Sequence, residues 1–191
     1  TFNLASRKDG SSMVYIFLAD GFEEIEALCP LDMLRRVGVP VQTVGVTGEH
    51  VTGAHEITVK SDITIDKIEM LEELEMIVLP GGKMGTENLD ASESLHAVLD
   101  YASERGLYIA AICAAPSILG KKGMLYGRSA VCYPGFEPTL EGANISGKPV
   151  VIDENIITAK GMGVSLPFAL ALVGILCGEE TAEKLKIAVI G

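Results

Sequence analysis

The cysteine at position 113 has the sequence context of a reactive thiol. It follows an apolar run, and the segment Ala111-Ile112-Cys113-Ala114-Ala115 places a small side chain two positions to either side of it. A sharp turn from a strand into a helix needs small flanking residues, as the G-x-S-x-G elbow of hydrolases does. Backbone N–H groups and the dipole of the following helix would stabilise a thiolate there, and the Ala114 N–H could bind an oxyanion. The local pattern leaves open the alternative that Cys113 is simply a buried apolar residue.

Two other segments carry groups that could serve this thiol. Pro80-Gly81-Gly82 ends an apolar run, and glycine lets the backbone approach a ligand and offer its N–H. The alternative for that segment is an ordinary turn. Glu23, Glu24 and Glu26 fall in the first turns of an expected helix, where the helix dipole alone favours acidic residues. Glu23 and Glu26 share a helix face, so spacing does not choose which of them would meet Cys113.

The segment Gly161-Met162-Gly163 is a weak match to a dinucleotide-binding loop. Leu166 stands where the third glycine of that loop belongs, and the segment lies near the end of the chain. A dinucleotide loop normally belongs to the first strand–helix–strand unit. We therefore expect no nucleotide cofactor, and we expect this turn to line the pocket around Cys113.

The remaining cysteines and the histidines do not form a metal-binding pattern. Cys29, Cys132 and Cys177 lack the elbow context and are expected in the core. There is no C-x-x-C pair, and the histidines are scattered among the cysteines without clustering (His50, His55 and His96). We expect no metal and no other cofactor. Widely spread thiols of this kind are typical of a reducing compartment, so we expect a cytoplasmic protein.

The elements that would position these residues alternate between strands and helices. Apolar runs predict buried strands at 14–19, 41–46, 75–79 and 107–112, with further strands at 55–60, 128–133 and within 150–160. Helical spacing predicts helices at 22–38, 92–105, after Cys113 to about Gly123, at 167–177 and at 181–186. Pro30 is expected to kink or split the first helix. This order predicts an α/β fold with a doubly wound, mainly parallel sheet and helices on both faces. Ligands would then collect at the loops 20–26, 80–85 and 113–116.

Composition limits the classes of partner. The chain has 191 residues, 26 of them acidic and 15 basic, for a formal net charge of −11. Such a surface would repel nucleic acid and anionic lipid, so we expect neither a nucleic-acid-binding surface nor membrane association. No apolar run is long enough to span a bilayer. Residues 1–12 are polar and irregular, and we treat them as an added leader or a loose extension. Residues 13–191 are expected to form a single domain.

Four segments resemble the ThiJ/PfpI family. They are DGFEEIEA at 20–27, LPGGKMGTENL at 79–89, AAICAAPSIL at 110–119 and TAKGMGVSLPFALALV at 158–173, and they occur in the family's order. The family includes protein deglycases associated with Parkinson disease, and it belongs to the class I glutamine amidotransferase-like superfamily. The resemblance runs from about Val14 to the end of the chain. It implies a flavodoxin-like fold with a cysteine nucleophile elbow, and a homodimer.

The resemblance also implies roles for individual residues. The family's nucleophile falls on Cys113, and its partner carboxyl, which is typically protonated, falls on Glu26. The amides that face an oxyanion fall on Gly82 and Ala114. The residues that line the pocket would be the following: Gly81, Tyr133, Gly161 and Met162.

The sequence departs from the family's pattern at two positions. The protease-like branch has histidine directly after the nucleophile, where this chain has Ala114, so we do not expect peptidase activity. Some relatives place a histidine where this chain has Tyr133, which is a poor base near neutral pH. Glutamine amidotransferases need a histidine in a late loop, and this chain offers none there. These departures leave Glu26 as the expected proton shuttle.

The resemblance implies two classes of function. In the first, the chain is an enzyme of the glutathione-independent glyoxalase or protein deglycase type, whose partner is a small carbonyl compound or a glycated protein or nucleotide. In the second, it is an oxidative-stress sensor or chaperone-like protein that uses an oxidisable Cys113 of low pKa. A role in thiamine biosynthesis follows only from the family's name, and the chain has no phosphate-binding G-x-x-x-x-G-K-[ST] loop to support it.

Overall fold

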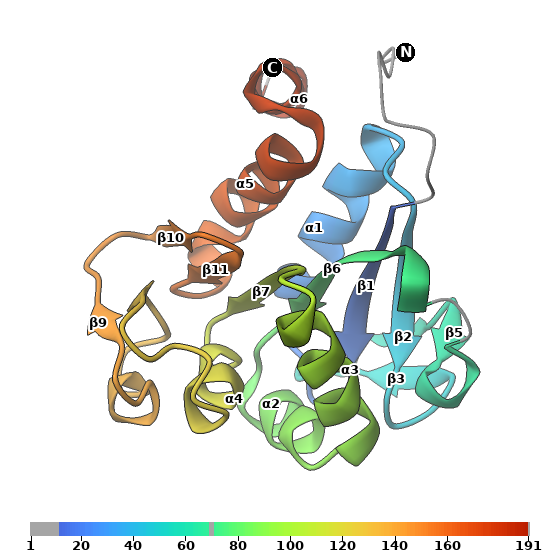
Figure 1. The fold of residues 1–191 in the computed structure, drawn as a ribbon. Helices are drawn as coiled ribbons and strands as arrows, with labels where there is room; N and C mark the ends of the chain where they lie inside the picture. Colours follow the sequence, from blue (N-terminus) through green and yellow to red (C-terminus); the bar gives the residue numbers. More distant parts are fainter. Residues whose placement is uncertain (1–11, 69–70, 191) are drawn as a thin grey trace.

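A central sheet organises the molecule (Figure 1). The structure is a computed structural model that describes residues 12–68 and 71–190. Within these residues, seven strands form one sheet in the spatial order β10, β11, β7, β6, β1, β2, β5. All neighbouring pairs are parallel except β10 with β11. In chain order the strands are β1 Met13–Leu18, β2 Val41–Gly45, β5 Ile63–Thr64, β6 Leu74–Leu79, β7 Tyr108–Ile112, β10 Val150–Asp153 and β11 Ile156–Ala159.

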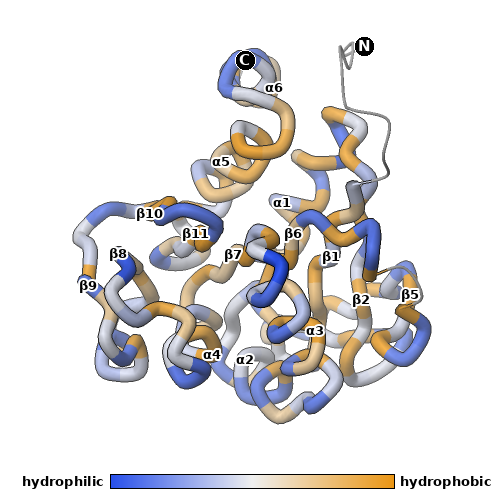
Figure 2. Tube along the Cα trace, in the orientation of Figure 1, coloured by the Kyte–Doolittle hydropathy of each residue, from blue (hydrophilic) through white to orange (hydrophobic). Residues whose placement is uncertain are grey.

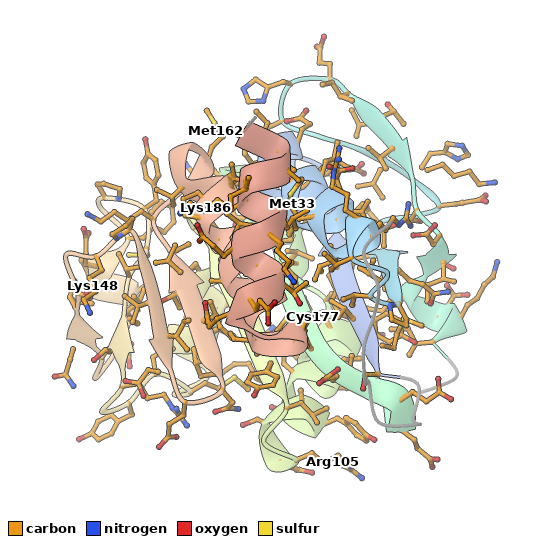
Figure 3. The ribbon with its side chains drawn as sticks, turned by 90° about the horizontal axis from the view of Figure 1, so that it is seen from above. Met33, Arg105, Lys148, Met162, Cys177 and Lys186 are labelled. Carbon is orange, nitrogen blue, oxygen red and sulfur yellow. The ribbon has the colours of Figure 1, made fainter. Side chains whose placement is uncertain are left out.

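Helices cover both faces of this sheet. The helices are α1 Glu24–Arg36, α2 Lys83–Asp90, α3 Glu93–Glu104, α4 Pro116–Lys121, α5 Ser165–Cys177 and α6 Glu179–Ile190. Apolar side chains of α1, α5 and α6 build one core with the strands, and those of α2, α3 and α4 build the other. Helix α5 packs against both α1 and α6, and Figure 3 looks down on this layer. The predicted doubly wound α/β fold is confirmed.

The central strands are buried because their apolar side chains pack into the cores on both faces of the sheet. Every residue of β1 after Met13 is buried, because alternate side chains point to opposite faces and both faces are covered. The hydropathy colouring in Figure 2 shows the same apolar character along β1 and β6. This arrangement brings the carboxyl ends of β1, β6 and β7 side by side at one edge, where the three expected loops begin.

Three expectations about the elements need correction. Pro30 does not split the first helix: α1 runs from Glu24 to Arg36 through this buried proline. Apolar contacts on both sides of the proline hold the helix against the sheet, so the loss of one backbone donor does not split it. Residues 83–90 form helix α2, where we expected only a loop up to Gly85. The strand expected at 128–133 shrinks to β8, Ser129–Ala130, which pairs with β9, Asn144–Ile145.

Smaller elements complete the fold. Strands β3, His50–Thr52, and β4, Thr58–Lys60, form a hairpin, and β4 covers the second half of the strand expected at 55–60. Short 3-10 turns occupy Ile65–Lys67, Leu71–Glu73, Glu137–Thr139 and Met162–Val164. None of the helices in the described part of the chain is long and apolar enough to cross a bilayer. Of the leader expected at 1–12, residues 1–11 lie outside the described residues.

Candidate active site

Cys113 lies on a tight turn between β7 and α4. Its φ angle is 65°, in the left-handed region that non-glycine residues rarely adopt. The backbone holds it there from both sides, because the Cys113 N–H donates to the Ala159 carbonyl oxygen at 2.9 Å and its own carbonyl oxygen accepts from the Tyr133 N–H at 2.7 Å. The turn closes through the Ala115 N–H, which donates to the Ile112 carbonyl oxygen at 3.1 Å. The strained backbone and small neighbours are those of a nucleophile elbow.

Glu26 reaches this turn from the first turn of α1. Its side chain is fully buried, and its Oε2 accepts a hydrogen bond from the Gly81 N–H at 2.8 Å. The other carboxyl oxygen, Oε1, is buried and has no hydrogen-bond partner among the described residues. A buried oxygen without a donor is a poor place for negative charge. The geometry therefore favours a proton on Oε1.

Gly81 lies in contact with both residues. A Cβ atom at this position would lie 2.6 Å from Cys113 Cβ and 2.6 Å from Glu26 Oε2, so no side chain fits between them. The Gly81 carbonyl oxygen also accepts from the Glu23 N–H at 3.0 Å, which ties this loop to the start of α1. The loops after β1, β6 and β7 thus meet at one point, as the strand order requires. The spacing of the acids left Glu23 and Glu26 equivalent, and the structure brings Glu26 to the thiol.

Two backbone amides face the sulfur. Gly82 has a φ of 83°, and a Cβ there would collide with the Gly21 carbonyl oxygen, so glycine is required. The backbone N–H groups of Gly82 and Ala114 both interact with the Cys113 side chain, and both lower its pKa. These are the two amides expected to hold an oxyanion.

Burial dominates the electrostatics of the pair. Burial raises the pKa of Glu26 from 4.5 to about 7, although the Gly81 N–H and the Cys113 side chain oppose the shift. Burial, followed by the negative charge of Glu26, raises the pKa of Cys113 above its ordinary value. The expectation of a thiol with a low pKa was therefore wrong, because removal from water outweighs the two amides. Since each group disfavours a charge on the other, the pair holds at most one negative charge near neutral pH.

Tyr133 and Gly161 also lie close to Cys113. A Cβ on Gly161 would lie 3.9 Å from Cys113 Sγ and 3.2 Å from Cδ2 of the Tyr133 ring. The side chains of Tyr133 and Met162 are both about half exposed, at 51% and 49%. Figure 3 shows Met162 at the periphery of the molecule. The structure thus gathers the predicted site residues around Cys113, except that the Met162 side chain points outward.

A second polar cluster lies beside the site, and the sequence did not reveal it. Glu24 is buried, at 4% exposure, and its Oε2 lies 2.9 Å from His55 Nδ1. Glu23 Oε1 lies 3.6 Å from the same nitrogen. His55 belongs to the β3–β4 hairpin, 31 residues away in sequence, and no periodic pattern links the two segments. The other three cysteines have the expected place, with Cys132 buried and Cys29 and Cys177 partly buried against the core.

The sequence of the chain is similar to those of known proteins. The model of the DJ-1/PfpI family matches residues 12–174. The chain is 35% identical over 180 residues to the Parkinson disease protein 7 homolog of Danio rerio, covering 92% of this chain and 95% of that protein. It is 32% identical over 151 residues to the deglycase PH1704 of Pyrococcus horikoshii, covering 78% and 90%.

Solved structures agree with the sequence matches. The crystal structure of Drosophila melanogaster DJ-1beta superposes with a TM-score of 0.88 at 32% identity, covering 94% of this chain and 98% of that one. The oxidized DJ-1 of Toxoplasma gondii gives a TM-score of 0.88 at 33% identity, with the same coverage. Sequence and structure together show that the chain belongs to the DJ-1/PfpI family.

Proposed function

We propose that the chain is a cysteine-dependent enzyme that acts on reactive dicarbonyls or on early glycation adducts of proteins or nucleotides. The observation that carries the proposal is the buried carboxyl of Glu26 beside the Cys113 thiol, with Gly81 packed against both side chains. Burial raises the pKa of this carboxyl to about 7. A group with a pKa near the working pH can both accept and return a proton. Relatives named as deglycases, from Pyrococcus horikoshii and Thermococcus kodakarensis, support the same class of activity.

The first step is attack of the Cys113 sulfur on the aldehyde carbon of a compound such as methylglyoxal. Glu26 accepts the thiol proton as the carbon–sulfur bond forms, and returns it to the oxygen to give a hemithioacetal. The amides of Gly82 and Ala114 hold this oxygen while it carries negative charge. Because these donors are fixed by the backbone, they need no rearrangement when the charge develops.

Glu26 then moves a proton from the aldehyde carbon to the neighbouring carbonyl carbon through an enediol. The first carbon becomes a thioester and the second an alcohol, so the substrate undergoes an internal redox change without an external oxidant. Water hydrolyses the thioester, which releases a hydroxy acid and restores the Cys113 thiol. In an early glycation adduct this carbon carries the amine nitrogen, so the carbon–sulfur bond would form as the carbon–nitrogen bond breaks, and Glu26 would pass the thiol proton to the departing amine.

Lactate formation from methylglyoxal without glutathione tests this proposal. We expect turnover by the wild-type chain and loss of turnover in Cys113→Ser and in Glu26→Gln. Cys29→Ser is the matched control, because Cys29 is a partly buried thiol on α1 that packs against the core. Wild-type rates in both site variants would refute the proposal.

A second candidate function is oxidant sensing through the same thiol. The unpartnered Oε1 of Glu26 could donate a proton to an oxygen of a sulfinic acid formed on Cys113. Mass spectrometry after mild peroxide treatment tests this function, with modification expected at Cys113 first. Earlier oxidation of Cys29 or Cys132 would refute it.

A further inference from the structure

The β3–β4 hairpin is hydrogen-bonded to the segment that connects β1 to α1. The Gly21 N–H donates to the Thr52 carbonyl oxygen at 2.7 Å, and the Ala54 N–H donates to the Phe22 carbonyl oxygen at 2.8 Å. In the reverse direction, the Thr52 N–H donates to Asp20 Oδ1 at 2.8 Å. The hairpin is therefore fixed to residues 20–22 by its backbone.

Glu24 and His55 complete this attachment. The His55 N–H donates to Glu24 Oε1 at 2.7 Å, and His55 Nδ1 lies 2.9 Å from Glu24 Oε2, so one residue engages both carboxyl oxygens. A Cβ on Gly53 would collide with this carboxylate, so only glycine fits beside it. The Glu24 side chain is buried, whereas the His55 side chain is 67% exposed. A buried carboxylate needs such partners to remain charged.

The segment between β1 and α1 is also hydrogen-bonded to the glycine loop beside Cys113. The Gly85 N–H donates to the Gly21 carbonyl oxygen at 3.1 Å, and the Glu23 N–H donates to the Gly81 carbonyl oxygen at 3.0 Å. The glycine loop that carries the Gly82 amide is therefore hydrogen-bonded to residues 21–23. Glu26 follows them within the first turn of α1. A movement of this segment would shift the loop and the carboxyl together.

The charge of Glu23 also acts on Glu26. The negative charge of Glu23 raises the pKa of Glu26, and His55 Nδ1 lies 3.6 Å from Glu23 Oε1, so a protonated imidazole would offset that charge. The hydrogen bond with Glu24, followed by the charges of Glu23 and Glu24, raises the pKa of His55. Although burial opposes ionisation of Glu24, hydrogen bonds from His55 hold its pKa below the ordinary value. Glu23 and Glu24 are the charged groups that act on His55.

We propose that His55 is a positioning residue for the reaction at Cys113: it holds the first turn of α1 through Glu24 and offsets the charge of Glu23 beside Glu26. The inference rests on the proposed function for its meaning in catalysis. Its effect on the thiol, however, exists whether or not a dicarbonyl is the substrate. Loss of the positive charge would disfavour any negative charge on the pair of Cys113 and Glu26.

The test is the pH profile of Cys113 alkylation by iodoacetamide, followed by mass spectrometry of the Cys113 peptide. We expect the midpoint to rise by about 0.5 pH unit in His55→Gln and His55→Ala, which corresponds to alkylation about threefold slower at neutral pH. His55→Arg keeps the charge and should restore the wild-type midpoint. His50→Gln is the matched control, because His50 is exposed on β3 of the same hairpin and should change nothing.

Two outcomes would overturn the inference. One is a wild-type midpoint in both His55→Gln and His55→Ala, and the other is an equal shift in His50→Gln. Circular dichroism of His55→Gln and His55→Ala checks that the fold is intact. If the wild-type chain does not turn over methylglyoxal, the proposed function fails, but the alkylation profile still decides the role of His55.

Discussion

Replacement of Glu26 by glutamine should make the protein more stable at neutral pH while abolishing the proposed activity. Burial raises the pKa of Glu26 from 4.5 in the unfolded chain to about 7 in the fold. The folded state therefore holds an extra proton between these two values, and the free energy of unfolding falls as the pH rises through that window. The shift of about 2.5 pH units corresponds to about 3 kcal/mol. Glutamine cannot ionise, so this loss is absent from the variant.

Guanidinium unfolding at pH 4.5, 6 and 8 measures the effect. Circular dichroism is a suitable probe because the chain contains no tryptophan. The stability advantage of Glu26→Gln over the wild type should grow by about 3 kcal/mol from pH 4.5 to pH 8. Glu87→Gln, on the exposed side of α2, is the control and should show no such growth. If the gap between Glu26→Gln and the wild type is the same at all three pH values, burial does not set the protonation of Glu26.

Three further substitutions test the packing around the thiol. Gly81→Ala should destabilise the fold by about 1–3 kcal/mol in chemical denaturation, because its Cβ would lie 2.6 Å from both Cys113 Cβ and Glu26 Oε2. Cys113→Gly should be more stable than Cys113→Ala by about 1 kcal/mol in thermal unfolding, since glycine accepts a φ of 65°; equal stabilities would show that the turn is not strained. Gly161→Val should slow alkylation of Cys113 by roughly tenfold by crowding the sulfur, and an unchanged rate would mean that reagents approach from another side.

Much of the fold can be predicted from local sequence. The continuous apolar runs of β1, β6 and β7 identify buried parallel strands, because both faces of such a strand are covered. Helix α2 escapes prediction because Gly85 weakens its helical pattern. That glycine is needed for packing, since a Cβ there would lie 2.6 Å from the Phe22 backbone. Pro30 misleads in the opposite direction, because tertiary contacts outweigh the helix-breaking tendency of one proline.

The site is harder to predict, because its energetics depend on burial. Cys113 and the glycines of residues 81–82 can be found from the elbow pattern and from the end of a strand. Acidic residues at the start of a helix normally suggest a solvated surface, yet Glu24 and Glu26 are both buried. The direction of the thiol pKa shift also escaped prediction, since the sequence shows the amides that lower it but not the desolvation that raises it. The contact between Glu24 and His55 depends on the hairpin folding back, which no local pattern encodes.

The order of strands in the sheet also determines at which stage of folding the Cys113 thiol becomes buried. Val14 pairs with Met76, and Ile77 pairs with Ile109, so the central strands join segments far apart in the chain. Parallel pairings over such separations form slowly. Until they form, Cys113 keeps the ordinary thiol pKa of about 8.5, whereas burial in the finished sheet raises it. A short pulse of alkylating reagent during refolding would therefore mark the chains that have not yet assembled the sheet, so Cys113 would report on sheet assembly.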